Sequence, residues 1–179
     1  MDFFIYSRGA PGAGEVDDPA LDEAHWSYMD RFAGGMIARG PTFAPDRATW
    51  NGSLHILSLP SAGAAREFVE REPYNRAGLF AEHVIRGFEN LLGRTMWESP
   101  VSSDDPRFLV IAHGPGPVTT LPRERLIVHG ALSTLDEGRP AGVVAALQAP
   151  TRAAAGAFVR AGDERADLEV LDWEFGGRR

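Results

Sequence analysis

The chain has 179 residues, 44% of them hydrophobic, and a formal net charge of −7 at pH 7. This length and composition are typical of a chain that buries its own core as one large domain or two small ones. The sequence contains no cysteine and no lysine, which excludes disulfides, thiolate nucleophiles, cysteine-bound metals, lysine Schiff bases and a P-loop lysine.

The charge pattern also argues against two classes of partner. Without a Lys/Arg-rich block, neither nucleic acid nor an anionic membrane is expected to bind. The N-terminal run has no basic segment followed by a long apolar stretch, and no segment approaches the ~20 apolar residues of a membrane span. A cytoplasmic location is therefore the expectation by default.

The first elements are a strand and a helix. Residues 3–6 form a short apolar run closed by glycine and proline, which predicts a strand. Asp18-Pro19 is a typical helix start and Gly34-Gly35 a typical stop, so a helix is expected between them. On one face of this helix, His25 recurs at helical spacing with apolar side chains, namely Leu21, Tyr28 and Phe32.

The next elements complete a recognisable order. Residues 36–38 predict a short strand that ends at Arg39-Gly40-Pro41, and residues 52–59 predict another strand. Ser61 caps a predicted helix that stops near Pro73, and residues 83–89 predict a last strand. The order strand, helix, strand, strand, helix, strand is that of a ferredoxin-like fold.

The second half repeats the first. Residues 95–106 lie in a polar, Ser/Asp/Pro-containing stretch that predicts a linker between domains 1–94 and 107–179. Eight identities at an offset of 90 support the repeat: they pair Gly40, Gly52, Leu57, Pro60, Ala64, Ala65, Phe68 and Val69 with Gly130, Gly142, Leu147, Pro150, Ala154, Ala155, Phe158 and Val159. Residues 115–125 are too short and too proline-rich to repeat the first helix, so we expect one site per chain, in the first half.

Several short motifs over roughly residues 2–94 resemble the YCII (YciI-like) family: His25 in the first helix, Gly40-Pro41, Ser61 before an Ala-Ala-Arg helix, Glu72-Pro73-Tyr74 and Ala77-Gly78. The resemblance implies the dimeric α+β barrel superfamily. The expected fold is thus α+β, with two ferredoxin-like halves whose antiparallel sheets pack as an intramolecular barrel pseudo-dimer. Further assembly into a homodimer of such chains stays open.

The same resemblance implies a catalytic pair. The best-understood activity in the family is that of a cofactor-free dehydrochlorinase that uses a histidine paired with an aspartate. His25 matches that histidine, and Glu72, one methylene longer, stands at the acidic position. Asp22 is an alternative partner, because it lies three residues before His25 on the same helix.

The residue types themselves allow two interpretations of His25. An imidazole titrates near neutral pH and can take and return a proton when a carboxylate orients it. A lone histidine on an apolar helix face is also found as a core residue bonded to a backbone carbonyl.

Four further residues are candidates for substrate binding. Tyr74 could donate a hydrogen bond to a substrate oxygen, and Arg39 could bind an anionic group; Trp26 and His55 complete the set. Each also has an ordinary structural alternative, in the core or on the surface. No metal site is predicted, because His25, His55 and His83 lack a ligand-spacing signature.

The leading functional hypothesis is a cofactor-free lyase, isomerase or cyclase that acts on a small, aromatic or polyketide-like molecule, with His25 as general base. One alternative is a cofactor-free monooxygenase of the α+β barrel type, which oxygen dependence would reveal. Another is a non-catalytic small-molecule-binding or accessory protein.

Overall fold

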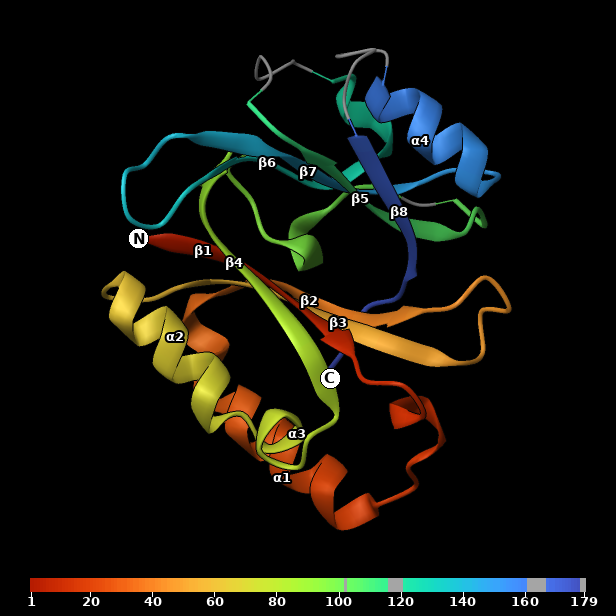
Figure 1. Ribbon diagram of the computed structural model, residues 1–179. Coiled ribbons are helices and arrows are strands. Elements are labelled where there is room, and N and C mark those ends of the chain that lie inside the picture. The colour runs from red at the N-terminus through yellow and green to blue at the C-terminus, as the bar shows by residue number, and fades with distance from the viewer. Residues whose placement is uncertain (102, 116–120, 161–166, 178–179) are drawn as a thin grey trace.

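The computed structural model describes residues 1–101, 103–115, 121–160 and 167–177, in which eight strands form one closed antiparallel barrel with four α-helices outside it (Figure 1). The strands are β1 (Asp2–Gly9), β2 (Met36–Phe43), β3 (Trp50–Ser58), β4 (Phe80–Asn90), β5 (Arg107–His113), β6 (Leu126–Ser133), β7 (Pro140–Gln148) and β8 (Asp167–Trp173). The helices are α1 (Pro19–Asp30), α2 (Ala62–Arg71), α3 (Pro73–Arg76) and α4 (Arg152–Arg160). Figure 1 shows α1, α2 and α3 on one side of the barrel and α4 on the other. Among the described residues, no helix has the length and apolar character of a membrane span.

Two groups of four strands build the barrel. The order around it is β1-β3-β2-β8-β5-β7-β6-β4, so β4-β1-β3-β2 and β8-β5-β7-β6 have the same internal order. Short ladders join the groups: β2 meets β8 at Thr42↔Trp173 and Phe43↔Asp172, and β4 meets β6 over residues 87–90. The α+β class and the antiparallel barrel are confirmed, whereas the division into duplicated domains 1–94 and 107–179 remains a proposal.

Both helix starts predicted in the first half are present. The Asp18 carboxylate accepts hydrogen bonds from the backbone N–H groups of Ala20 and Leu21 at the start of α1. The Ser61 hydroxyl accepts one from the backbone N–H of Ala64 in α2. Each cap satisfies donors that the first turn of a helix leaves without a partner.

Strand β2 continues through Gly40 and Pro41, where the sequence pattern predicted its end. Pro41 fits because the ladder with β8 begins only at Thr42, so β2 needs no backbone donor to β8 at position 41. Gly40 has φ +157°, and another segment of backbone crosses its open side. Glycine and proline here mark a close approach between segments and not a turn.

The predicted linker, residues 95–106, is packed against the barrel. It contains a short 3-10 helix, Met96–Glu98, whose start is closed by a reciprocal capping box between Thr95 and Glu98. The Met96 side chain is 1% exposed and belongs to the barrel core. This connection therefore contributes to the hydrophobic core as well as joining β4 to β5.

Between β5 and β6, residues 114, 115 and 121–125 are described. They include one 3-10 helix, Arg123–Arg125, and no α-helix. Part of the segment predicted to lack a helix, residues 116–120, lies outside the described residues. Leu121 and Leu92 are buried in the apolar cluster beneath α4.

The barrel interior is filled by side chains from both strand groups. Because successive side chains of a strand point to opposite faces, Phe4 and Tyr6 of β1 point inward, whereas Phe3 and Ile5 pack with α1 and α2. Inward side chains of the second group, such as Leu109 and Trp173, meet those of the first in one cluster. A cavity lies on the outer, helix-covered side of β2 and β3.

Candidate functional site

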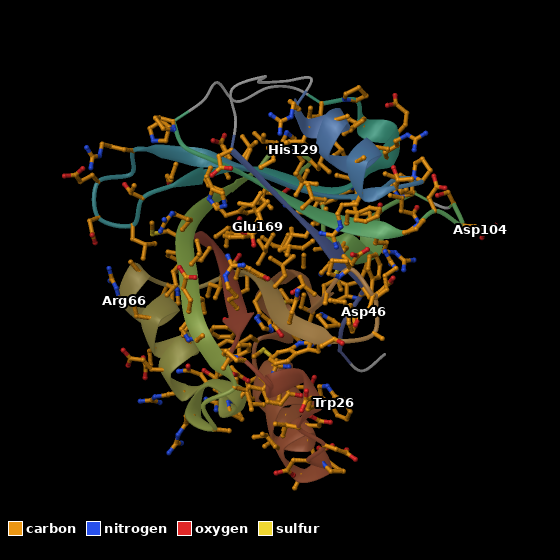
Figure 2. All side chains as sticks on the ribbon, turned by 45° about the vertical axis from the view of Figure 1, so that its right-hand side comes forward. Trp26, Asp46, Arg66, Asp104, His129 and Glu169 are labelled. Carbon is orange, nitrogen blue, oxygen red and sulfur yellow. The ribbon has the colours of Figure 1, made fainter. Side chains whose placement is uncertain are left out.

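A cavity of about 430 Å³ lies between α1, the outer side of β2 and β3, α3 and the segment that follows β8. Figure 2 places Trp26, one of its lining residues, on α1. The cavity is lined by His25, Trp26, Met29, Arg39, Gly40, Pro41, Trp50, Ser53, His55, Tyr74, Phe175, Gly176 and Gly177. Its volume suits a small organic molecule, and its lining combines aromatic rings with a few polar groups.

The His25 imidazole forms a short hydrogen bond with a buried carboxylate. Its Nδ1 atom lies 2.6 Å from Oε1 of Glu72, whose side chain is 3% exposed. The other carboxylate oxygen of Glu72 accepts the backbone N–H of Asn75 at 2.8 Å, because Glu72 ends α2 and caps α3. With Nδ1 held by Glu72, Nε2 is the ring nitrogen of His25 that can exchange a proton with a molecule in the cavity.

Tyr74 supports this pair with its ring. The rings of Tyr74 and His25 are stacked, with centroids 4.2 Å apart and planes 2° from parallel. The Tyr74 hydroxyl donates a 2.6 Å hydrogen bond to Asp22 Oδ1, and burial followed by this bond raises the pKa of Tyr74. The structure thus brings Asp22 to Tyr74 and not to His25, and the Tyr74 hydroxyl points to Asp22 and not to a substrate.

Arg39 and His55 lie opposite each other on the cavity floor. They are paired residues of β2 and β3, with 8% and 3% of their surfaces exposed. Burial, followed by the neighbouring His25 and Arg39 side chains, lowers the pKa of His55 well below its usual range. Arg39 therefore supplies the cavity with a buried cation, next to a neutral imidazole.

His83, the third histidine of this half, belongs to another hydrogen-bond network. Its Nδ1 bonds to the Ser7 hydroxyl at 2.9 Å and its Nε2 to Asn75 Oδ1 at 2.8 Å. Burial lowers its pKa. Among the described residues no group of three or more histidines and carboxylates is arranged to hold a metal ion.

We expect the lowered pKa values of His55 and His83 to make stability depend on pH. The unfolded chain takes up protons near pH 6.5 more readily than these two side chains do in the fold, so their contribution to stability is present above that pH and is lost as pH falls below it. Between pH 7.5 and 5.5, His55 alone should lower the free energy of unfolding by about 1.4 kcal/mol.

Thermal melts across that pH range test this expectation. The drop in Tm should be smaller in His55→Gln than in the wild type. His113→Gln replaces an exposed histidine that lies 3.5 Å from Glu169 and should not make the drop smaller. Equal pH dependence in the wild type and His55→Gln would contradict the assignment of His55 as the neutral, buried group.

The second half offers no matching site in its described residues. At the position offset by 90 from Arg39, His129 is 2% exposed and its Nδ1 bonds to the backbone carbonyl of Val144. Opposite it stands Ala145, where the first half has His55. This agrees with a single site per chain, which remains a proposal.

Sequence reasoning missed several cavity residues. Ser53 shares the outer face of β3 with His55, two positions away, and this period-two spacing was a usable signal. Met29 follows His25 by one helical turn and was equally accessible to prediction. Phe175, Gly176 and Gly177 carried no such signal, because they reach the cavity only through closure of the barrel.

Comparison with known proteins adds a family and a fold. The profile of the YCII-related domain matches residues 1–89. A 5-chloro-2-hydroxyhydroquinone dehydrochlorinase from Burkholderia phenoliruptrix, solved in complex with 2,5-dihydroxybenzoquinone, is 30% identical over 48% of this chain and 90% of its own, with a TM-score of 0.43. Among curated proteins, no relative matches the chain.

Two further solved structures align with nearly the whole chain. A candidate chlorite dismutase has a TM-score of 0.54 and 12% identity, over 97% of this chain and 95% of its own. A candidate monooxygenase from Lactobacillus acidophilus has a TM-score of 0.46 and 7% identity, over 97% of this chain and 93% of its own. The candidate chlorite dismutase structure supports the dimeric α+β barrel fold for both strand groups together.

Proposed function

Because this chain belongs, through its N-terminal half, to the YCII-related domain family, we propose that the cavity beside His25 is the active site of an enzyme that transfers protons on a small organic molecule. The observation that carries the proposal is the 2.6 Å hydrogen bond between His25 and Glu72 at the cavity wall. A buried carboxylate that is fixed at both oxygens holds one imidazole tautomer and stabilises the imidazolium once it forms.

The proposed reaction begins at Nε2, the ring nitrogen of His25 that does not bond to Glu72. His25 Nε2 takes a proton from a C–H or O–H group of the substrate, and the electron pair of the broken bond stays on the substrate as an enolate or phenolate. Loss of a leaving group from a neighbouring carbon completes an elimination, and return of the proton to another atom completes an isomerisation or cyclisation. His25 supplies the base itself, so the proposal invokes no cofactor.

Arg39 is the proposed partner of the developing negative charge. Arg39 lines the cavity and is 8% exposed as a residue, so its interaction with an oxyanion is little screened by water. Its Nη1 also lies 3.8 Å from Oδ1 of Asp30, whose side chain is exposed. His55 beside Arg39 is neutral, so the positive charge offered to the anion is that of Arg39. Aromatic faces at Trp26, Trp50 and Tyr74 favour a flat substrate.

A lyase is the reaction type that we propose first. The dehydrochlorinase that is 30% identical to this chain eliminates hydrogen chloride, as its name states, and its complex contains a dihydroxylated quinone. Planar phenols and quinones are therefore the first compounds to test. The leaving group for this chain is not specified by the cavity.

A thermal-shift screen tests the proposal. The panel contains 2,5-dihydroxybenzoquinone, substituted phenols, lactones and short carboxylic acids. A ligand at 100 times its Kd adds about 2.7 kcal/mol, which for a chain of this size raises Tm by roughly 5–11 °C. The shift should be lost in His25→Ala and retained in His113→Ala, which removes an exposed histidine outside the cavity lining.

Two outcomes would contradict the proposal. The first is a ligand that stabilises the wild type and His25→Ala equally, which would separate binding from His25. The second is turnover of a hit only in the presence of oxygen, which would favour monooxygenase chemistry over proton transfer.

A further inference from the structure

The segment that follows β8 runs along β2 and over the cavity. β8 passes from the strand group beside α4 to β2, as Figure 1 shows in blue. After it, the backbone N–H of Glu174 donates to the carbonyl of Pro41 at 3.2 Å, and that of Gly176 donates to the carbonyl of Arg39 at 3.1 Å. Phe175, Gly176 and Gly177 thereby line the same cavity as His25. We call these three residues the tail wall.

The contact between β2 and residues 174–176 is made by backbone atoms. A Cβ atom on Gly40 would lie 1.9 Å from the carbonyl oxygen of Glu174, and one on Gly176 would lie 2.6 Å from Cα of Gly40. A Cβ on Gly177 would lie 2.1 Å from the guanidinium of Arg39. Glycine at these positions lets the tail wall cover both β2 and the buried cation.

Charged and aromatic contacts hold the tail wall in this position. The Glu174 carboxylate accepts hydrogen bonds from Arg107 of β5 at 2.6 Å and from Arg47, in the connection between β2 and β3, at 3.1 Å. The Arg107 guanidinium lies 4.7 Å from the Phe175 ring centroid, and the Trp173 ring lies 5.3 Å from it. A carboxylate held by two arginines at the start of the segment fixes where the following residues lie.

We propose that the tail wall determines specificity: it limits the size of the molecules that reach His25 and keeps water from Arg39. The second strand group, which has no His25 of its own, thus completes the site of the first. The inference deepens the proposed function and rests on it for the identity of the cavity as a substrate site. The experiment that tests it measures how fast reagents of different size alkylate His25, and it does not require a known substrate.

The chain's composition allows a direct measurement of access. With no cysteine and no lysine, histidine imidazoles and methionine thioethers are the main side-chain targets of α-bromoketones, and peptide mapping distinguishes the two. Two reagents with the same reactive group are compared, small bromoacetone and bulky 2-bromo-2′-acetonaphthone, with alkylation rates at each histidine read by peptide mass mapping. Exposed His113 corrects for the intrinsic reactivity of each reagent.

In the wild type, we expect His25 to react with bromoacetone much faster than with the naphthyl reagent. Phe175→Ala removes the largest side chain of the tail wall, and Glu174→Ala removes its anchor. Each should reduce this size discrimination by at least roughly tenfold, as a pocket contact that selects by size commonly does. Glu137→Ala removes an exposed ion pair with Arg139 in the β6–β7 turn and should leave the discrimination unchanged.

Several results would overturn the proposal. One is equal discrimination in the wild type, Phe175→Ala and Glu174→Ala, with Glu174→Gln as the milder variant if Glu174→Ala unfolds. Another is wild-type His25 that reacts with neither reagent. Failure of the proposed function is distinguishable, because the ligand screen would then find no His25-dependent binding while size discrimination at His25 still depended on Phe175.

Discussion

His25→Asn should lower kcat for any compound that the wild type turns over by about 10²–10⁴-fold, the range of a general base. Asparagine can still donate a hydrogen bond to Glu72, so the buried carboxylate keeps a partner and the fold is retained. The measurement is kcat under saturating substrate, with Tm and circular dichroism as checks on folding. A loss below tenfold would contradict the assignment of His25 as the base.

The same assay distinguishes the two carboxylates. Glu72→Gln places an amide where Glu72 accepts from both His25 and the backbone of Asn75, so it should lose at least roughly 10²-fold in kcat. Asp22→Asn keeps an acceptor for the Tyr74 hydroxyl and should lose less than about tenfold. A larger loss in Asp22→Asn than in Glu72→Gln would transfer the orienting role to Asp22.

Gly40→Ala should lower the free energy of unfolding by about 3 kcal/mol, the upper part of the range for overpacking, or roughly 6–12 °C in Tm. The new Cβ would meet backbone atoms of Glu174 and Gly176, which cannot move aside as a flexible side chain can. The φ of +157° adds strain for any residue with a Cβ.

Gly34→Ala is the matched control, because its Cβ would have no neighbour within 4 Å and its φ is not positive. We expect its Tm to stay within about 2 °C of the wild type. Thermal melts of both variants decide the matter. If Gly40→Ala melts like Gly34→Ala, the backbone contact between β2 and the tail wall is looser than the structure has it.

Local signals in the sequence predicted much of the first half. Asp18 and Ser61 cap helices through donors two or three residues away, so a short window contains the full cause of each start. Gly40 and Pro41 were misinterpreted as a strand end for the opposite reason. Their cause is the crossing of residues 174–176, which no local window contains.

The candidate site, like the fold of the first half, was predicted in part. The family resemblance pointed to His25 and Glu72, and the structure places their side chains in direct contact. Spacing along α1 favoured Asp22 as an alternative partner, but spacing cannot show that Tyr74 from α3 takes its carboxylate. The tail wall was missed because it depends on two ladder pairs between β2 and β8.

Those few ladder pairs also have a kinetic consequence. Thr42 and Trp173 pair across most of the sequence, so their contact carries more loop-closure entropy than the pairs within a strand group, and we expect it to form late in folding. The contacts within each strand group join residues much nearer in sequence and can form first. During refolding, His25 can therefore contact Glu72 before the cavity is closed. We expect the size discrimination between the two bromoketones at His25 to recover later than the His25–Glu72 hydrogen bond.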